Sequence, residues 1–314
     1  MSVAGTNAAR ERRGANAGRT AAPSGAAHAA SSATTHAAST AGTNATAGAE
    51  RIHRAFARAR SDGRAALITY IVAGYPDADT SLRSVLAAAD AGADIIEVGL
   101  PYSDPLADGA TIQRATGAAL RAGATFDGSL DLVRRIAAER PELPLVPMGY
   151  ANQVIGGGDG AATARRLAEA GASGLIIVDL TPDEGGPFEA VARSAGLAVV
   201  YIVAPTTGPA RRTMVANRSG GFLYCVSLLG VTGARATLPA TVGRLVRDVK
   251  AVSPVPVAVG FGVSRPAHVR SLARAGADGV VVGSALVDAL GPDGRDVDRL
   301  ATLIRSLRGA TGSK

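Results

Sequence analysis

The stretch AGADIIEVG at residues 91–99 decides the fold class. Its glycine supplies the left-handed residue that ends a helix, and the apolar run after it is typical of a parallel strand covered on both faces. The same junction returns as AGAS at residues 170–173 and AGAD at residues 275–278, each before another apolar run. The copies are unevenly spaced, so they mark repeated helix-to-strand junctions rather than a strict sequence repeat.

Eight continuously apolar runs alternate with amphipathic, Ala- and Arg-rich stretches of helical spacing. The predicted strands occupy residues 66–72, 95–99, 145–148, 174–178, 198–203, 221–226, 255–259 and 279–282. Eight strand-helix units in one domain fit a closed (β/α)8 TIM barrel of about 250 residues better than an open doubly wound sheet. The sequence therefore predicts an α/β barrel domain over residues 51–314.

Residues 1–50 consist almost entirely of Ala, Ser, Thr, Gly and Asn with scattered Arg. Such a segment buries too little apolar surface to offset the entropy of ordering it, so we expect a disordered N-terminal extension. Its Arg content and lack of acids are also typical of an organelle transit peptide, although it lacks an amphipathic stripe. An over-long start site is the third interpretation.

Composition excludes several classes of protein. A lone cysteine, Cys225, excludes a disulfide framework and multi-cysteine metal clusters, and the four histidines have no metal-ligand spacing. The net charge is +7, but the basic residues are scattered along the chain and interspersed with acidic ones. Aromatic residues make up 4% of the chain, and there is no Trp. We therefore expect no metal and no nucleic-acid partner. No apolar run approaches the roughly 20 residues of a membrane span, so we expect a soluble protein, and we expect it in the cytoplasm.

Glu97 is an acid inside a predicted buried strand. Burial disfavours the charged carboxylate, so its pKa should rise. At the carboxyl end of a barrel strand it would face the pocket where this fold carries out its chemistry. The structural alternative is an ion pair with one of the many arginines.

Two more acids follow in the loop PYSDPLADG at residues 101–109. Asp104 precedes a proline and is also typical of a turn residue that bonds to its local backbone. Asp108 lies just before a helix predicted to begin near Thr111, where capping is its alternative role. Two acids at the rim of one pocket suit acid/base chemistry.

A phosphate site is predicted after the last two strands. The segment GFGVS at residues 260–264 and the pair Gly283 and Ser284, which opens a short helix, offer backbone N–H groups to an anion. Loops after strands seven and eight are the usual phosphate seat of this fold. The alternative is that both segments are simply tight turns.

A second glycine-rich segment, GVTGAR at residues 230–235, follows the strand that carries Tyr224. It is either a lid that excludes water from the bound substrate or an ordinary flexible connection. Tyr224 either donates a hydrogen bond into the pocket or fills the barrel core. Cys225 has no activating neighbour in the sequence and is interpreted as a packing residue.

The stretch EVGLPYSDPLADGATIQ at residues 97–113 closely resembles the signature of the α subunit of tryptophan synthase. Supporting similarity lies in residues 70–76, 150–152 and 230–233, at Asp179 and in the two phosphate segments, and the whole likeness covers about residues 51–310. Departures include Ala110 where the signature usually has Pro, Thr181 in place of a frequent Pro, Leu228 where some members have Arg, and a variant loop at residues 149–152.

The resemblance implies a (β/α)8 barrel lyase of tryptophan biosynthesis, which cleaves indole-3-glycerol phosphate by a retro-aldol reaction to indole and glyceraldehyde 3-phosphate. It implies that Glu97 transfers protons at the indole carbon and the side-chain hydroxyl, and that Asp108 binds the indole N–H. Tyr224 would line the same pocket as a third catalytic residue. The implied substrate- and phosphate-binding residues are Tyr70, Tyr150, Thr232, Gly233, Gly262, Gly283 and Ser284.

The resemblance also implies a partner, a β subunit that carries pyridoxal phosphate in an α2β2 heterotetramer, and no cofactor on this chain. One alternative is a stand-alone lyase of the same family that releases free indole. A different phosphate-binding barrel enzyme, such as a sugar isomerase, fits the acidic signature less well. A non-catalytic barrel that regulates a partner is the alternative from another functional class.

Overall fold

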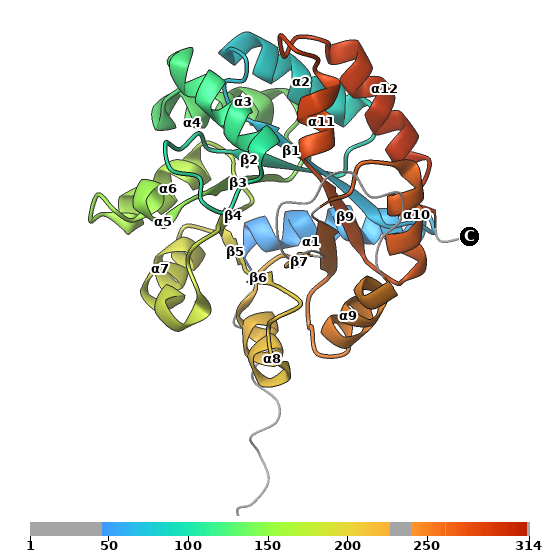
Figure 1. Ribbon diagram of the computed structural model, residues 1–314. Coiled ribbons are helices and arrows are strands. Elements are labelled where there is room, and N and C mark those ends of the chain that lie inside the picture. Colours follow the sequence, from blue (N-terminus) through green and yellow to red (C-terminus); the bar gives the residue numbers. More distant parts are fainter. Residues whose placement is uncertain (1–45, 227–239, 261, 313–314) are drawn as a thin grey trace, which may run out of the picture. The chain divides into compact units, whose positions relative to one another are not determined.

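Nine parallel strands form the wall of a barrel in the computed structural model, which describes residues 46–226, 240–260 and 262–312. Their order around the sheet is β5-β4-β3-β2-β1-β9-β8-β7-β6, with helices outside them (Figure 1). The strands are β1 (Ala66–Val72), β2 (Ile95–Gly99), β3 (Leu145–Gly149), β4 (Gly174–Ile177), β5 (Ala198–Val200), β6 (Ile202–Val203), β7 (Leu223–Val226), β8 (Val257–Gly260) and β9 (Gly279–Val282). The predicted α/β barrel is confirmed.

The eight predicted strands become nine because the fifth is interrupted at Tyr201. The two edge strands of the sheet, β5 and β6, are the two halves of this one predicted strand. Tyr201 joins them, so the two edges of the sheet meet at this residue. Its backbone N–H donates to Ser219 Oγ at 3.0 Å, and its carbonyl accepts the N–H of Tyr224 at 3.0 Å. A side chain thus takes the place of one ladder bond at the seam.

The other predicted strands agree with the structure at both ends or differ by one or two residues. β7 begins at Leu223 rather than Gly221, because Gly221 adopts a positive φ of 70° that no strand residue has. β8 begins at Val257, directly after Pro256, which has no N–H to donate to a ladder.

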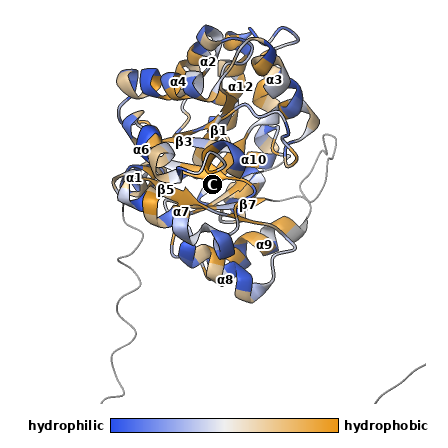
Figure 2. Ribbon diagram, turned by 90° about the vertical axis from the view of Figure 1, so that its left-hand side faces the viewer, coloured by the Kyte–Doolittle hydropathy of each residue, from blue (hydrophilic) through white to orange (hydrophobic). Residues whose placement is uncertain are grey.

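The helices present polar residues to the outside and apolar residues to the strands (Figure 2). They are α1 (Ala47–Ser61), α2 (Ala78–Asp90), α3 (Ala110–Arg121), α4 (Phe126–Glu139), α5 (Ala151–Val154), α6 (Gly160–Glu169), α7 (Pro182–Ser194), α8 (Pro209–Arg218), α9 (Ala240–Lys250), α10 (Pro266–Arg274), α11 (Ser284–Ala289) and α12 (Val297–Arg308). Within the described ranges, no helix is both long and apolar enough to cross a membrane.

Helix α1 covers the amino ends of the strands. Its Ile52 and Phe56 pack into a cluster of inward-facing strand residues, here called the interior cluster, which includes Ile68, Ile95 and Tyr224. Gly48 donates its N–H to Gly196 O at 2.9 Å, just before β5 begins. Helix α1 thus covers the end of the barrel opposite to the carboxyl ends of the strands, where this fold carries out its chemistry.

The helix also corrects the predicted extent of the tail. Thr46 caps α1 by accepting the N–H of Ala49 at 3.0 Å, and Gly48 and Ala49 are buried. Residues 46–50 are therefore part of the barrel domain. Their composition predicted a solvent-exposed segment, but Gly48 and Ala49 pack against the barrel. The remainder of the predicted tail, residues 1–45, lies outside the described residues.

The repeated sequence junction has a structural counterpart. The last residue of each copy donates its N–H to the preceding strand: Asp94 to Leu67 O at 2.8 Å, Asp278 to Val257 O at 2.9 Å and Ser173 to Leu145 O at 2.7 Å. The carboxylates of the two aspartates also accept a backbone N–H in return, Asp94 from Leu67 and Asp278 from Val257. Each repeat of the motif therefore starts one parallel ladder.

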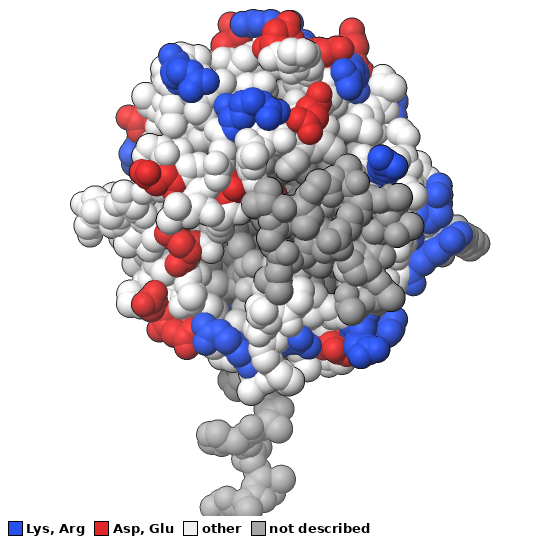
Figure 3. Space-filling view, viewed as in Figure 1, with Lys and Arg blue, Asp and Glu red and all other residues white. Residues whose placement is uncertain are grey.

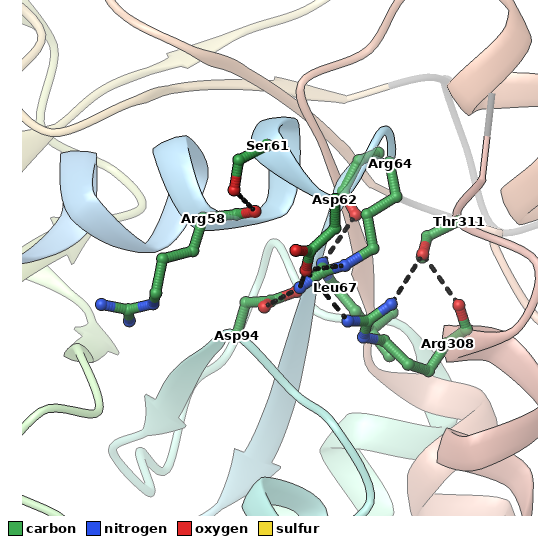
Figure 4. A network of polar contacts seen from close by, with 9 residues as sticks. Arg58, Ser61, Asp62, Arg64, Leu67, Asp94, Arg308 and Thr311 are labelled. Atoms are coloured by element: carbon green, nitrogen blue, oxygen red, sulfur yellow. Dashed lines mark hydrogen bonds and ion pairs between the residues drawn. The ribbon is translucent and has the colours of Figure 1, made fainter.

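A basic side chain completes the first of these junctions. Arg64 donates through both terminal nitrogens to Asp94, at 2.7 and 2.8 Å, and its side chain is only 8% exposed. Asp62 and Arg308 join the same network (Figure 4). This largely buried pair fixes the start of β2, the strand that carries Glu97.

Gly48→Ala is expected to lower the free energy of unfolding by about 1–3 kcal/mol, since a Cβ there would lie 1.8 Å from Ser173 O and force α1 away from the barrel. Urea unfolding measures the loss. Gly117→Ala in α3 is the control, because its Cβ would meet only the flexible end of Arg121 at 3.3 Å. Equal stabilities of the two variants would contradict this role of Gly48.

Candidate active site

The candidate site begins where the interior cluster ends. Tyr70 in β1 and Glu97 in β2 are paired residues of adjacent strands. Each lies two positions beyond an interior-cluster residue, Ile68 and Ile95, and therefore points to the same inner face. Tyr224 reaches this level from β7 on the other side of the seam. Three of the predicted residues thus form one layer inside the barrel.

Glu97 is buried, with 1% of its surface exposed, and its Oε1 has no hydrogen-bond partner. Burial alone raises its pKa from 4.5 to about 8. Among the described residues, no Arg or Lys forms an ion pair with it. The structural alternative, a buried ion pair with arginine, is not observed in the part of the chain that the structure describes, and burial is the cause of the raised pKa there.

Asp108 lies in the loop between β2 and α3 and is half-buried. Its Oδ2 accepts a hydrogen bond from the Tyr150 hydroxyl at 3.1 Å. Burial raises its pKa, and the tyrosine bond opposes the rise. The alternative capping role is not observed, because Gly109 is the N-cap of α3 and no side chain caps that end. The carboxylate is instead held by a residue of the next strand-helix unit.

Electrostatic coupling joins these side chains into one site. Burial raises the pKa of Tyr70, and the charges of Asp108 and Glu97 raise it further. Burial followed by the charge of Glu97 has the same effect on the pKa of Tyr224. The phenols stay neutral over the whole working range of pH and keep their hydroxyl protons for donation.

Two glycines make room for these tyrosines. A Cβ at Gly99 would lie 2.1 Å from the Tyr70 hydroxyl oxygen, and one at Gly260 would lie 2.3 Å from that of Tyr224. Sequence reasoning treated both only as parts of longer motifs. Their signal was a glycine as the last residue of a strand, which marks a close approach by another group.

The loop of Asp108 is fastened to residues that follow β3, which sequence reasoning did not assign to positioning. The hydroxyl of Tyr150 accepts the N–H of Ala107 at 3.1 Å, and its ring stacks on that of Tyr102 with centroids 5.1 Å apart. Asn152 donates to the Tyr102 hydroxyl at 3.1 Å. Only the tertiary fold reveals these partners, because they lie about 40 to 50 positions apart in sequence.

Asp179 fixes the neighbouring segment from the end of β4. Its Oδ1 accepts the N–H of Ala151 at 2.7 Å, at the first residue of α5. The carboxylate of Asp104 is exposed and accepts the hydroxyl of the neighbouring Ser103 at 2.8 Å, rather than a local backbone N–H as the turn interpretation predicted. Asp179 therefore orients the segment that holds Asp108, whereas Asp104 does not reach the pocket layer.

The predicted phosphate residues that the structure describes follow the adjacent strands β8 and β9. Gly262 has a φ of 73°, a conformation that favours glycine. Gly283 precedes α11 as its N-cap, and a Cβ added to it would lie 3.4 Å from Tyr70 Cβ. Ser284 opens the helix with an exposed side chain. Thr232, Gly233 and the predicted lid at residues 230–235 lie outside the described residues.

Other candidates lie away from this layer. Cys225 is buried in the core between strands and helices, and burial raises the pKa of its thiol to about 12, which fits a packing residue. No group of three His, Cys, Asp or Glu side chains among the described residues is arranged to hold a metal ion. Arg and Lys are interspersed with acids around the face shown in Figure 3.

The stability of the protein should depend on pH through Glu97. The unfolded chain loses this proton near pH 4.5, whereas the folded protein keeps it to about pH 8. Stability therefore falls as pH rises through this window, by up to about 1.4 kcal/mol per pH unit. We expect Glu97→Gln, which cannot ionise, to gain stability relative to the wild type between pH 5 and pH 8.

Urea unfolding at a series of pH values measures this difference, with Asp104→Asn as the control for loss of an exposed carboxylate. A difference between Glu97→Gln and wild type that stays constant from pH 5 to pH 8 would contradict the raised pKa.

Comparison with known proteins agrees with the geometry. A family model described as tryptophan synthase alpha chain matches residues 56–310. The tryptophan synthase alpha chain of Chloroflexus aggregans is 46% identical over 240 residues, covering 76% of this chain and 89% of that relative. The alpha chain of a Roseiflexus species is 43% identical over 261 residues, covering 82% of this chain and 99% of its own length.

Solved structures give the same result. Tryptophan synthase from Mycobacterium tuberculosis superimposes with a TM-score of 0.77 at 42% identity, over 83% of this chain and 98% of that one. A mutant tryptophan synthase alpha-subunit from Pyrococcus furiosus gives 0.72 at 36% identity, over 79% and 99% of the two chains. By both sequence and structure, the chain belongs to the tryptophan synthase alpha chain family, the lyases that cleave indole-3-glycerol phosphate to indole and glyceraldehyde 3-phosphate.

Proposed function

We propose that Glu97, Asp108 and Tyr224 carry out the retro-aldol cleavage of indole-3-glycerol phosphate in this chain. The observation that carries the proposal is a buried carboxyl group that has no cationic partner among the described residues and lies near neutral phenols on the inner face of the barrel. A group of this kind exchanges protons near neutral pH, as acid/base catalysis requires.

Glu97 acts twice in the proposed sequence. The protonated carboxyl group first donates its proton to the indole carbon that bears the side chain, which leaves a cationic ring. The resulting carboxylate then takes the proton of the side-chain hydroxyl next to the ring. The carbon–carbon bond breaks as its electron pair returns to the ring, so indole and an aldehyde are formed and Glu97 is protonated again. A pKa of about 8 makes both forms accessible.

Asp108 accepts the indole N–H and stabilises the positive charge on the ring between these two steps. Its hydrogen bond from Tyr150 supports the ionised form and orients the carboxylate. Tyr70, Tyr150 and Tyr224 line the pocket with neutral hydroxyl groups and apolar ring faces. The buried surroundings strengthen the attraction between carboxylate and cationic ring relative to water.

The phosphate group belongs at the loops after β8 and β9. Gly262, Gly283 and Ser284 offer backbone N–H groups and a hydroxyl there, and the proposal adds Thr232 and Gly233. Holding the anionic end at a distance from Glu97 would orient the ring against the two carboxyl groups.

The proposal includes a β subunit as partner, because alpha chains of this family work with one, and an α2β2 assembly. The alpha chain needs no cofactor of its own; pyridoxal phosphate would belong to the β subunit. Leu106 supports the presence of a partner, because this apolar side chain lies on the loop that carries Asp108 with 92% of its surface exposed. The proposal also places the chain in the cytoplasm, and the β subunit would have to share that compartment.

Two alternatives stay open to test. A stand-alone lyase would have the same pocket but no need of a partner, and only an assay with the β subunit distinguishes it. A non-catalytic regulator has less support, because an unpaired buried carboxyl group costs stability that a mere binding surface has no reason to bear.

Glu97→Gln should lower indole release from indole-3-glycerol phosphate by about 10²–10⁴-fold, because the amide cannot transfer the proton. Indole is measured in steady state with saturating substrate. Binding of glycerol 3-phosphate should persist within twofold, since no bond to phosphate is lost. In the wild type, kcat/KM should fall as pH rises past about 8, where free Glu97 loses its proton.

Asp104→Asn is the matched control, because it removes an exposed acid of the neighbouring loop without touching the pocket layer. Its activity should equal that of the wild type. Indole release by Glu97→Gln at the wild-type rate would refute the assignment of the proton transfer.

Mixing the chain with a purified β subunit should give a larger complex by size-exclusion chromatography and faster indole release than the chain alone. Leu106→Asp should weaken this complex about tenfold or more, since burying a leucine side chain contributes about 1.5–3 kcal/mol. Rapid cleavage by the isolated chain without any complex would favour the stand-alone lyase instead.

A further inference from the structure

The loop of Asp108 is attached to the neighbouring strand-helix unit through one short segment. Tyr150, Asn152 and Gln153 each form a hydrogen bond with residues 101–108. Asn152 and Tyr102 are the exposed or half-buried outer pair of this attachment. Gln153 contributes the inner bond, at the point where the loop leaves β2.

The carboxamide of Gln153 joins two backbones. Its Nε2 donates to Pro101 O at 2.8 Å, and its Oε1 accepts the N–H of Tyr150 at 3.1 Å. Pro101 begins the loop that carries Asp108, and Tyr150 is the residue whose hydroxyl bonds Asp108. One side chain therefore fixes both the start of the loop and the backbone of the tyrosine that holds its catalytic acid.

The surroundings are shaped around this carboxamide. A Cβ at Gly149 would lie 2.9 Å from Gln153 Oε1, so the glycine leaves the space that the amide oxygen occupies. The two bonds require a donor and an acceptor on one group. Among uncharged side chains of this length only glutamine has both, whereas glutamate keeps the acceptor and loses the donor when ionised.

We propose that Gln153 is a positioning residue for Asp108, acting through Tyr150 and the start of the loop. This inference rests on the proposed role of Asp108 in the cleavage reaction. By fixing the Tyr150 backbone, Gln153 sets where the phenol hydroxyl lies, and the hydroxyl in turn sets where the carboxylate meets the indole N–H. Gln153 itself touches no reacting atom.

Gln153→Leu tests the proposal, because leucine is of similar size and forms neither bond. We expect kcat/KM for indole-3-glycerol phosphate to fall roughly tenfold, the scale of one to two lost hydrogen bonds. Affinity for glycerol 3-phosphate, measured by calorimetry, should remain within twofold, since this probe has a phosphate but no indole. Gln153→Glu should lose less than Gln153→Leu, because its oxygen still accepts the Tyr150 N–H.

A double-mutant cycle separates positioning from a general structural effect. In a Tyr150→Phe background the hydroxyl that transmits one part of the effect is gone, so adding Gln153→Leu should lower kcat/KM by clearly less than the roughly tenfold loss in the wild-type background, and the remaining loss reports the bond to the start of the loop. Full additivity would overturn the route through Tyr150. An equal loss of glycerol 3-phosphate affinity would overturn it as well, because the substitution would then disturb the barrel as a whole.

Indole release by the wild type, measured beside Gln153→Leu, distinguishes a failure of this inference from a failure of the proposed function on which it rests. If the wild type releases indole and Gln153→Leu matches it within twofold, the positioning role is wrong and the proposed function stands. If the wild type itself releases no indole, the proposed function fails first.

Discussion

An unpaired carboxyl group inside the barrel is the constraint on which the site depends. Glu97 has no cation beside it among the described residues, so burial holds its proton to about pH 8. The same burial keeps Tyr70 and Tyr224 neutral. The interior cluster next to it is largely apolar, and α1 packs against that cluster at the amino ends of the strands. Burial of this acid lowers the stability of the fold, and it provides a group that can donate a proton near neutral pH.

The barrel positions that acid through contacts at both ends of β2, a side-chain ion pair at one end and a glycine at the other. At the amino end, Arg64 and Asp94 fix where the strand begins, and at the carboxyl end Gly99 leaves space for the Tyr70 ring. The closing seam at Tyr201 has a similar consequence on the other side. Its carbonyl bonds the backbone N–H of Tyr224. Fold and site therefore share the same contacts, so a change in register would move the tyrosines relative to Glu97.

Asp108 depends on a different principle, because it lies on a loop rather than a strand. Loops take their geometry from what they contact, and this one contacts residues after β3. Tyr150 bonds the carboxylate directly, and Gln153 bonds both the loop and Tyr150. The two acids are thus held by different means, one by the rigid sheet and one by a set of hydrogen bonds that a partner or a substrate could alter.

Local sequence was sufficient for the strand-helix alternation, for three strands to the residue and for Glu97 and Asp108 as candidates, because apolar periodicity and glycine junctions are properties of neighbouring residues. The tertiary structure alone decided the rest. The break at Tyr201 depends on Ser219, the inclusion of residues 46–50 depends on the barrel end they cover, and the orientation of Asp108 depends on Tyr150. Whether Glu97 meets an arginine or none is likewise set by which side chains share the barrel interior. Contacts between distant residues carry no local pattern, since they are fixed only when the chain closes into a ring.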